Sequence, residues 1–151
     1  MAMSGDEKIG LKLIGNNQED LKVISAHLQD SIVLVKDIVF LQQNKTFIMI
    51  VNRFMWEDIE KGVFRQNKRT RCAVKFNSVV KALSKNINQK NQNKPLECLA
   101  IKCTSIDNGA YEIKIFFAGD SAITIISETL EVFMEDLGKP WNVKHVPQHK
   151  I

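Results

Sequence analysis

The residues of this chain with the clearest chemical potential are its cations. The stretch "FRQNKRTR", residues 64–71, holds four cations in eight residues. The basic run extends over residues 61–94, where ten lysines and arginines occur without one Asp or Glu. Phosphate contacts need cations along one face and little else. The sequence therefore makes residues 61–94 the candidate surface for an anionic partner, with nucleic acid preferred to a membrane.

One segment of this run alternates as a β-strand does. In "RTRCAVKF" a period of two places Arg71 and Lys75 on one face, and Cys72, Val74 and Phe76 on the other. Few aromatic residues accompany the cations, whereas proteins that bind single strands usually offer several stacking groups. The candidate anion-binding residues are Arg65, Lys68, Arg69, Arg71, Lys75 and Arg53.

Arg53 has two interpretations, because it lies inside the otherwise apolar segment "TFIMIVNRF". Beside Phe54 and Trp56 it could hold a phosphate or stack on a base. Alternatively it ends the strand by pairing with a carboxylate such as Glu57 or Asp58, while its stem packs on Trp56. We favour the pairing, and we keep Arg53 among the candidates.

Motifs that carry enzyme chemistry are scarce. The sequence contains no GxGxxG, phosphate loop, HExxH or GxSxG. Pro147 lies between His145 and His149, which argues against a metal site in the tail, and the acids form no obvious pair. We therefore expect no metal, no cofactor and no catalytic residue, although catalytic groups need only meet in space.

Length and composition limit the class of protein. With 151 residues, of which 44% are hydrophobic and 25% charged, the chain fits one soluble domain with a substantial core. No apolar run approaches the roughly 18 residues that a spanning helix needs, so we expect no membrane insertion. The first ten residues lack a secretory apolar core, and the three cysteines match no zinc or redox spacing. These features predict a cytoplasmic protein.

The net charge of +4 hides an asymmetry along the chain. Residues 61–94 carry +10, so the rest of the chain carries −6. Such polarity can steer anionic partners. The chain is also rich in Lys, Asn and Ile, as an A/T-rich genome tends to encode, and compositional drift is the competing explanation. Drift accounts for many lysines but not for the missing acids.

The positions of these residues depend on the predicted elements. A helix is expected over 18–29, where Leu21, Ile24 and Leu28 recur at helical spacing and Asn17 can cap the first turn. "SIVLVKD" and "DIVFLQ" predict two short strands with a turn near 36–37. "TFIMIVNRF" and "RTRCAVKF" predict two more, and "SVVKAL" either continues the last strand or opens a helical turn.

The second half of the chain has stronger turn signals. "LECLAIKCTSI" and "YEIKIFF" flank Asn108–Gly109, the strongest short hairpin signal, and "AGDS" predicts a second turn into "AITIISE". Residues 86–94 read as a polar loop. In "TLEVFMEDLG" the period returns to 3.6, which predicts a helix that ends at Gly138 before Pro140.

This order of elements predicts an α+β fold that is mainly antiparallel β. About seven strands would form a pleckstrin-homology-like barrel or curled sheet, with an N-terminal helix and a C-terminal amphipathic capping helix. We expect a flexible N-terminus at 1–10, one globular domain at 11–141 and a flexible tail at 142–151.

Several stretches also resemble a known family. "DLKVISAHLQD", "NRFMWE", "KRTRCAVKF", "LECLAIKC", "IFFAGDSAITI" and "EDLGKPW", in this order from Leu11 to about Trp141, are similar to the bacterial family called domain of unknown function 2948, found mainly in alphaproteobacteria. The resemblance implies a small stand-alone protein with no assigned activity, so no catalytic residue can be transferred. The loop at 86–94 departs from the resemblance.

Two functions from different classes remain. The first is a non-enzymatic protein-interaction or scaffold module, which binds a peptide or another copy of itself at a sheet edge or groove. The second is a nucleic-acid or anion binder that uses residues 61–94. The first function is preferred because it requires the fewest specific features of the sequence, and an enzyme is the third choice.

Overall fold

The computed structural model describes residues 10–57 and 67–143. Its one α-helix in these ranges is α1, Gln18–Leu28, and two short 3₁₀ turns, η1 and η2, cover Gln42–Asn44 and Asp107–Gly109. The strands are β1 Lys12–Gly15, β2 Ile32–Leu41, β3 Thr46–Phe54, β4 Asn67–Phe76, β5 Val79–Lys85, β6 Pro95–Ser105, β7 Tyr111–Phe117, β8 Ser121–Ser127 and β9 Val132–Val143. The expected tails and Arg65, His145 and His149 lie wholly or largely outside the described residues.

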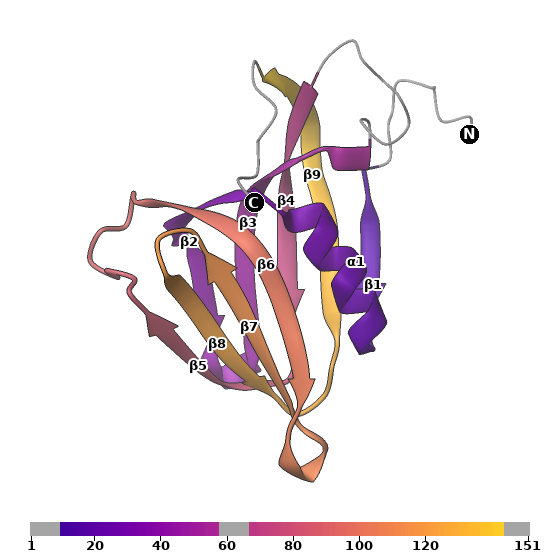
Figure 1. Ribbon diagram of the computed structural model, residues 1–151, viewed down its shortest axis with the longest axis vertical. Helices are drawn as coiled ribbons and strands as arrows, with labels where there is room; N and C mark the ends of the chain where they lie inside the picture. Colours follow the sequence, from indigo (N-terminus) through magenta and orange to yellow (C-terminus); the bar gives the residue numbers. More distant parts are fainter. Residues whose placement is uncertain (1–9, 58–66, 144–151) are drawn as a thin grey trace.

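The nine strands form one antiparallel sheet in the order β1-β9-β4-β3-β2-β6-β7-β8-β5, and this sheet is not closed (Figure 1). One half of the sheet runs from β1 to β2 in this order, and the other runs from β6 to β5. The two halves are joined by a short pairing, in which only Ile32–Leu34 of β2 pair with β6. The mainly antiparallel α+β prediction is confirmed. The predicted barrel of about seven strands is wrong in strand count and in closure.

The predicted C-terminal helix is also wrong, because its residues form β9. This strand pairs with β4 from Asn67↔Val143 to Phe76↔Val132, and it pairs with β1 on its other edge. Val132 and Met134 point into the core, while Phe133 and Leu137 lie on the opposite face. The backbone N–H and C=O groups of this segment are thus hydrogen-bonded to two neighbouring strands, although the spacing of its apolar residues suited a helix. Pairing with distant strands has overridden the local sequence pattern.

β2 replaces the two strands expected around residues 36–37. The pairing with β3 shifts register between Val33 and Ile38, so a β-bulge stands where a turn was predicted. "SVVKAL", which the sequence left open, forms β5 after Ser78, whose φ is +60°. The predicted hairpin at Asn108–Gly109 is confirmed, and both residues take positive φ in the connection between β6 and β7.

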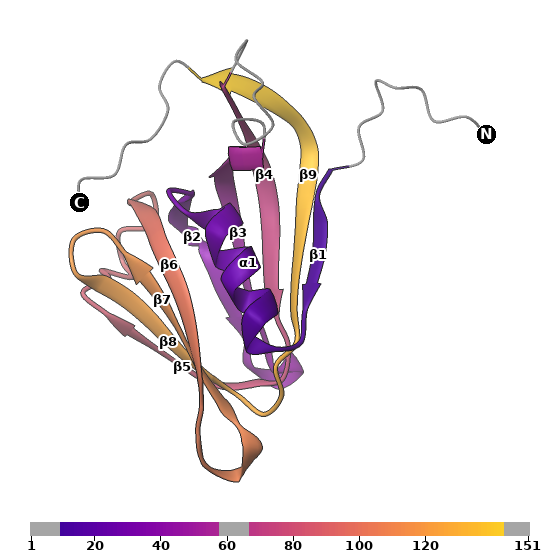
Figure 2. The same cartoon turned by 45° about the vertical axis from the view of Figure 1, so that its right-hand side comes forward.

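The helix α1 lies between β1 and β6 and contacts both strands (Figure 2). Asn17 accepts a hydrogen bond from the Asp20 amide, as predicted, and Leu21, Ile24 and Leu28 are buried against the sheet. A Cβ added at Gly15 would lie 2.9 Å from Ile24 Cδ1, so glycine permits this close approach of β1. The described residues hold no helix long and apolar enough to cross a bilayer.

Candidate functional site

Arg53 lies at the centre of a buried ion cluster, and its side chain is fully inaccessible to solvent. Its Nε and Nη2 donate to the two carboxylate oxygens of Asp136, each at 2.7 Å. Nη1 and Nη2 donate to Glu57 at 2.9 and 2.7 Å, and Nη1 also donates to the Phe54 carbonyl at 3.4 Å. All five guanidinium N–H donors are therefore used.

The surroundings of this cluster explain its charge states. Burial lowers the pKa of Arg53, but hydrogen bonds and charge attraction from Asp136 and Glu57 outweigh burial, so the net pKa is raised. For Glu57, burial raises the pKa, and the bonds and charge of Arg53 lower it below its ordinary value overall. Asp136 also accepts from the Leu11 amide at 3.0 Å. The cluster thereby ties β3 to β9 and to the chain entering β1.

Arg69 is half-buried and serves largely as a structural donor. Its Nη1 donates to the carbonyls of Asp30 and Asn52, each at 3.1 Å, and its guanidinium carbon lies 5.8 Å from the Phe54 ring centre. Burial lowers the pKa of Arg69. Lys68 is next along β4 and, by strand alternation, faces the opposite way.

Arg71 and Lys75 are exposed on the outer face of β4, as alternation predicted. The register places Leu137 opposite Arg71 and Phe133 opposite Lys75, and Lys75 Nζ lies 5.1 Å from the Phe133 ring centre. Trp141 is opposite Arg69 on the same face, because directly opposed residues share a side of the sheet. We call this surface the β4–β9 face. Sequence reasoning missed its aromatics because Phe133 and Trp141 come from a segment predicted to be helix and loop.

A second candidate site is the opening where the sheet fails to close. Residues 38–41 of β2 pair with β3 alone among the described strands, and β5, the last strand in the order, pairs with β8 alone. The Val79 amide donates to the Lys45 carbonyl at one end. At the other end, the Val35 and Lys36 amides donate to carbonyls of Lys94 and Gln92. We call the opening between residues 37–41 and 79–85 the window.

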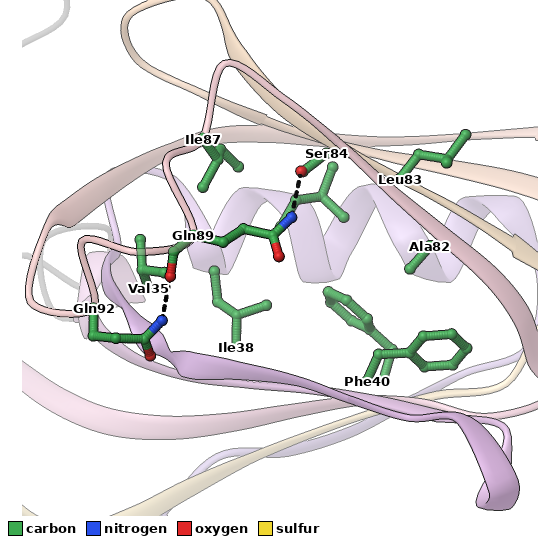
Figure 3. A pocket seen from close by; sticks show the side chains of 11 residues that line it. Val35, Ile38, Phe40, Ala82, Leu83, Ser84, Ile87, Gln89 and Gln92 are labelled. Carbon is green, nitrogen blue, oxygen red and sulfur yellow. Dashed lines mark hydrogen bonds between the residues drawn. The ribbon is translucent and has the colours of Figure 1, made fainter.

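A cavity of about 310 Å³ lies behind the window. In Figure 3 side chains converge on it from β2, from β5 and from the loop at 86–94. The lining residues share an aliphatic or aromatic character apart from three polar ones, and they are Val35, Ile38, Phe40, Phe47, Ala82, Leu83, Ser84, Ile87, Gln89, Gln92 and Ile123. The volume lies at the lower end of the range, about 300–1,000 Å³, that ligand pockets occupy.

The polar lining residues hold the loop at 86–94 beside the window. Gln89 Nε2 donates to Ser84 Oγ at 3.0 Å, and Gln92 Nε2 donates to the Gln89 carbonyl (Figure 3). Ser121 Oγ donates to the Asn86 carbonyl at 2.8 Å. Within the polar loop, Ile87 turns inward and packs against the core. That lone isoleucine in "KNINQKNQNK" is the one sequence signal that could have revealed a folded-back loop.

The described residues do not form an evident catalytic centre. No group of three or more His, Cys, Asp or Glu within 10–57 and 67–143 is placed to hold a metal. Burial raises the pKa of the Cys72 thiol to about 12, and burial together with the charge of Asp30 does the same for Cys98. Neither thiol is a nucleophile at neutral pH, because the thiolate is the reactive form.

Comparison with known proteins gives one match. A family model described as Protein of unknown function (DUF2948) matches residues 11–149, which agrees with the resemblance seen in the sequence. No curated protein and no solved structure matches the chain. The description names no activity that could be carried over.

Proposed function

This chain belongs to the family Protein of unknown function (DUF2948), and we propose that it is a non-enzymatic interaction module, which binds an extended peptide in the window between β2 and β5. We propose that the protein is located in the cytoplasm, where a reducing environment keeps its three cysteines as free thiols. The observation that carries the proposal is the pair of open strand edges that flank a cavity lined mostly by apolar side chains.

Two physical features favour a peptide over a small apolar molecule. A strand edge presents unpaired backbone N–H and C=O groups, and an added peptide strand satisfies them. The side chains of such a strand alternate, so one set enters the cavity while the other faces solvent. Apolar side chains also stand exposed on both sides of the window, at Val39, Leu41, Val80 and Leu83. A small molecule could fill the cavity but would leave the edges unpaired.

The proposal is tested by selecting nine-residue peptides from a phage-displayed library on the full chain. Ala82→Phe would fill the cavity from β5, and we expect it to abolish binding of the enriched peptides. Ala122→Phe makes the same change of size on neighbouring β8, where it faces outward, and should leave binding intact. Hydrogen exchange should slow at residues 38–41 and 79–85 on binding. Peptides that bind Ala82→Phe as well as the parent protein, or that protect other segments, would refute the proposal.

A second candidate function rests on the β4–β9 face. There Lys75 stands beside Phe133, and Trp141 lies opposite Arg69 further along the two strands. Cations next to stacking groups suit single-stranded nucleic acid. A fluorescence titration with labelled RNA should show affinity that falls by orders of magnitude between about 50 and 200 mM salt. Arg71→Glu with Lys75→Glu should remove that binding, whereas no binding at the lower salt excludes this candidate.

A further inference from the structure

Lysines stand along three sides of the window, and the half-buried Asp37 follows Lys36 on the β2 side. Lys36 follows Val35 in β2, Lys81 and Lys85 flank the cavity-lining part of β5, and Lys90 and Lys94 lie in or at the end of the loop at 86–94. Residues 77–96 contain no Asp or Glu. All five lysines are exposed. The window is therefore an opening lined mostly by apolar side chains, with a mainly cationic rim.

The ion pairing of these lysines differs from that of several others. Lys12, Lys22 and Lys114, away from the rim, and Lys45, at the end of the window beside Val79, each have a carboxylate partner within 4.0 Å. Of the five lysines named above, only Lys85 has such a partner in the described part of the chain, namely Asp120 at 3.4 Å. Lys36, Lys81, Lys90 and Lys94 have no carboxylate that close among those residues, so their charge is available to a partner.

We infer that the peptide bound in the window is acidic. An apolar side chain of the peptide enters the cavity between Phe40, Phe47 and Ile123, and Asp or Glu residues on either side meet the rim lysines. β5 has seven residues, which at about 3.3 Å per residue span roughly 23 Å, so a segment of about six to eight residues fits. The inference rests on the proposed function and specifies its partner.

An acidic peptide is the occupant that uses all three features of the window. Its backbone pairs with the strand edges, its apolar residue fills the cavity, and its carboxylates balance the lysines. A nucleic acid has phosphates for the lysines but no amide backbone to extend a sheet. A second copy of this chain would bring its own basic rim against the first, and like charges in contact oppose that pairing.

The test compares three fluorescein-labelled peptides built from one sequence enriched in the selection. Every position that does not face the cavity is Glu in the first peptide, Gln in the second and Lys in the third. We expect the Glu peptide to bind at least tenfold more tightly than the Gln peptide, and the Lys peptide to bind weakest. Lys81→Glu with Lys90→Glu should weaken the Glu peptide at least tenfold. Arg71→Glu with Lys75→Glu, which makes the same change of charge on the β4–β9 face, should leave its affinity unchanged.

The outcomes separate this inference from the proposal beneath it. If the Gln and Lys peptides bind as tightly as the Glu peptide, and Ala82→Phe still abolishes binding, the peptide site stands and the acidic preference is overturned. If the selection enriches no peptide, both are overturned. If sedimentation shows a dimer that Ala82→Phe dissociates, the occupant is a second copy and the acidic peptide is excluded.

Discussion

Replacing Arg53 with methionine should strongly destabilise the fold, because the guanidinium compensates two carboxylates at once. Arg53→Met keeps an unbranched apolar stem but removes the cation that pairs with both Asp136, whose side chain is 4% exposed, and Glu57, at 19%. Removing one partner of a buried ion pair typically costs about 3–5 kcal/mol. That loss is a large share of the roughly 5–15 kcal/mol by which domains are stable.

The assay is thermal and urea unfolding followed by circular dichroism. For a chain of this length about 1 kcal/mol shifts Tm by roughly 2–4 °C, so we expect a fall of roughly 6–20 °C. The matched control is Arg71→Met on the exposed β4–β9 face, where the change should stay within about 0.5 kcal/mol. A loss for Arg53→Met no larger than that of the control would refute the view that this cluster holds the strands together.

The pH dependence of the loss has a defined sign. In the parent protein the folded pKa of Glu57 is lowered, so the group stabilises the fold above its unfolded pKa, and this stability is lost as the pH falls through the folded pKa. Without Arg53 the burial that raises this pKa is opposed only by a backbone hydrogen bond and by His27. The charged carboxylate then costs stability at neutral pH, and protonation removes that cost. The deficit of Arg53→Met should therefore shrink as the pH falls towards about 5.

A further variant separates lost packing from uncompensated charge. Adding Glu57→Gln and Asp136→Asn to Arg53→Met removes both orphaned charges, and the amide oxygen of the introduced asparagine can still accept from the Leu11 amide. We expect this triple variant to be more stable than Arg53→Met alone, because isosteric neutral groups avoid the buried charge. If it is less stable, shape and hydrogen bonding rather than charge dominate at this site.

Two other predictions test the core and the helix start. A thiol reagent should modify the half-buried Cys103 in the native protein, although burial raises the pKa of this thiol too. Cys72 and Cys98 should react only in denaturant, because their side chains are almost fully inaccessible to the reagent; three fast native thiols would contradict this. Asn17→Ala should cost about 1 kcal/mol in urea unfolding, because it removes the side-chain acceptor for the Asp20 amide; an unchanged midpoint would show that the cap contributes nothing.

The elements that were predicted correctly depend on neighbours close in the chain. The helix α1 follows from the cap at Asn17 and from apolar residues that recur every three to four positions, and the hairpin follows from Asn108–Gly109, where positive φ is required. The alternation of apolar and charged residues in β4 correctly predicts which of its side chains are buried, without knowledge of the partner strands. Local geometry alone constrains such features.

β9 was mispredicted because its conformation is decided by partners far away in the sequence. Its backbone pairs with β4 and β1, and Asp136 meets Arg53 across the sheet, none of which local spacing reveals. Gly138 does need positive φ, as the sequence suggested, but it lies where the pairing of β4 with β9 shifts register instead of at a helix end.

The candidate site shows the same division. The sequence determined the supply of cations between 61 and 94 and their alternation on β4, and it favoured a carboxylate partner for Arg53 over a phosphate or a base. Only the tertiary structure decided that the sheet stays open between β2 and β5, that Phe40 and Phe47 line the gap, and that a basic loop frames it. Sheet closure depends on the register and curvature of strands over the whole chain, whereas charge and alternation are properties of neighbouring residues.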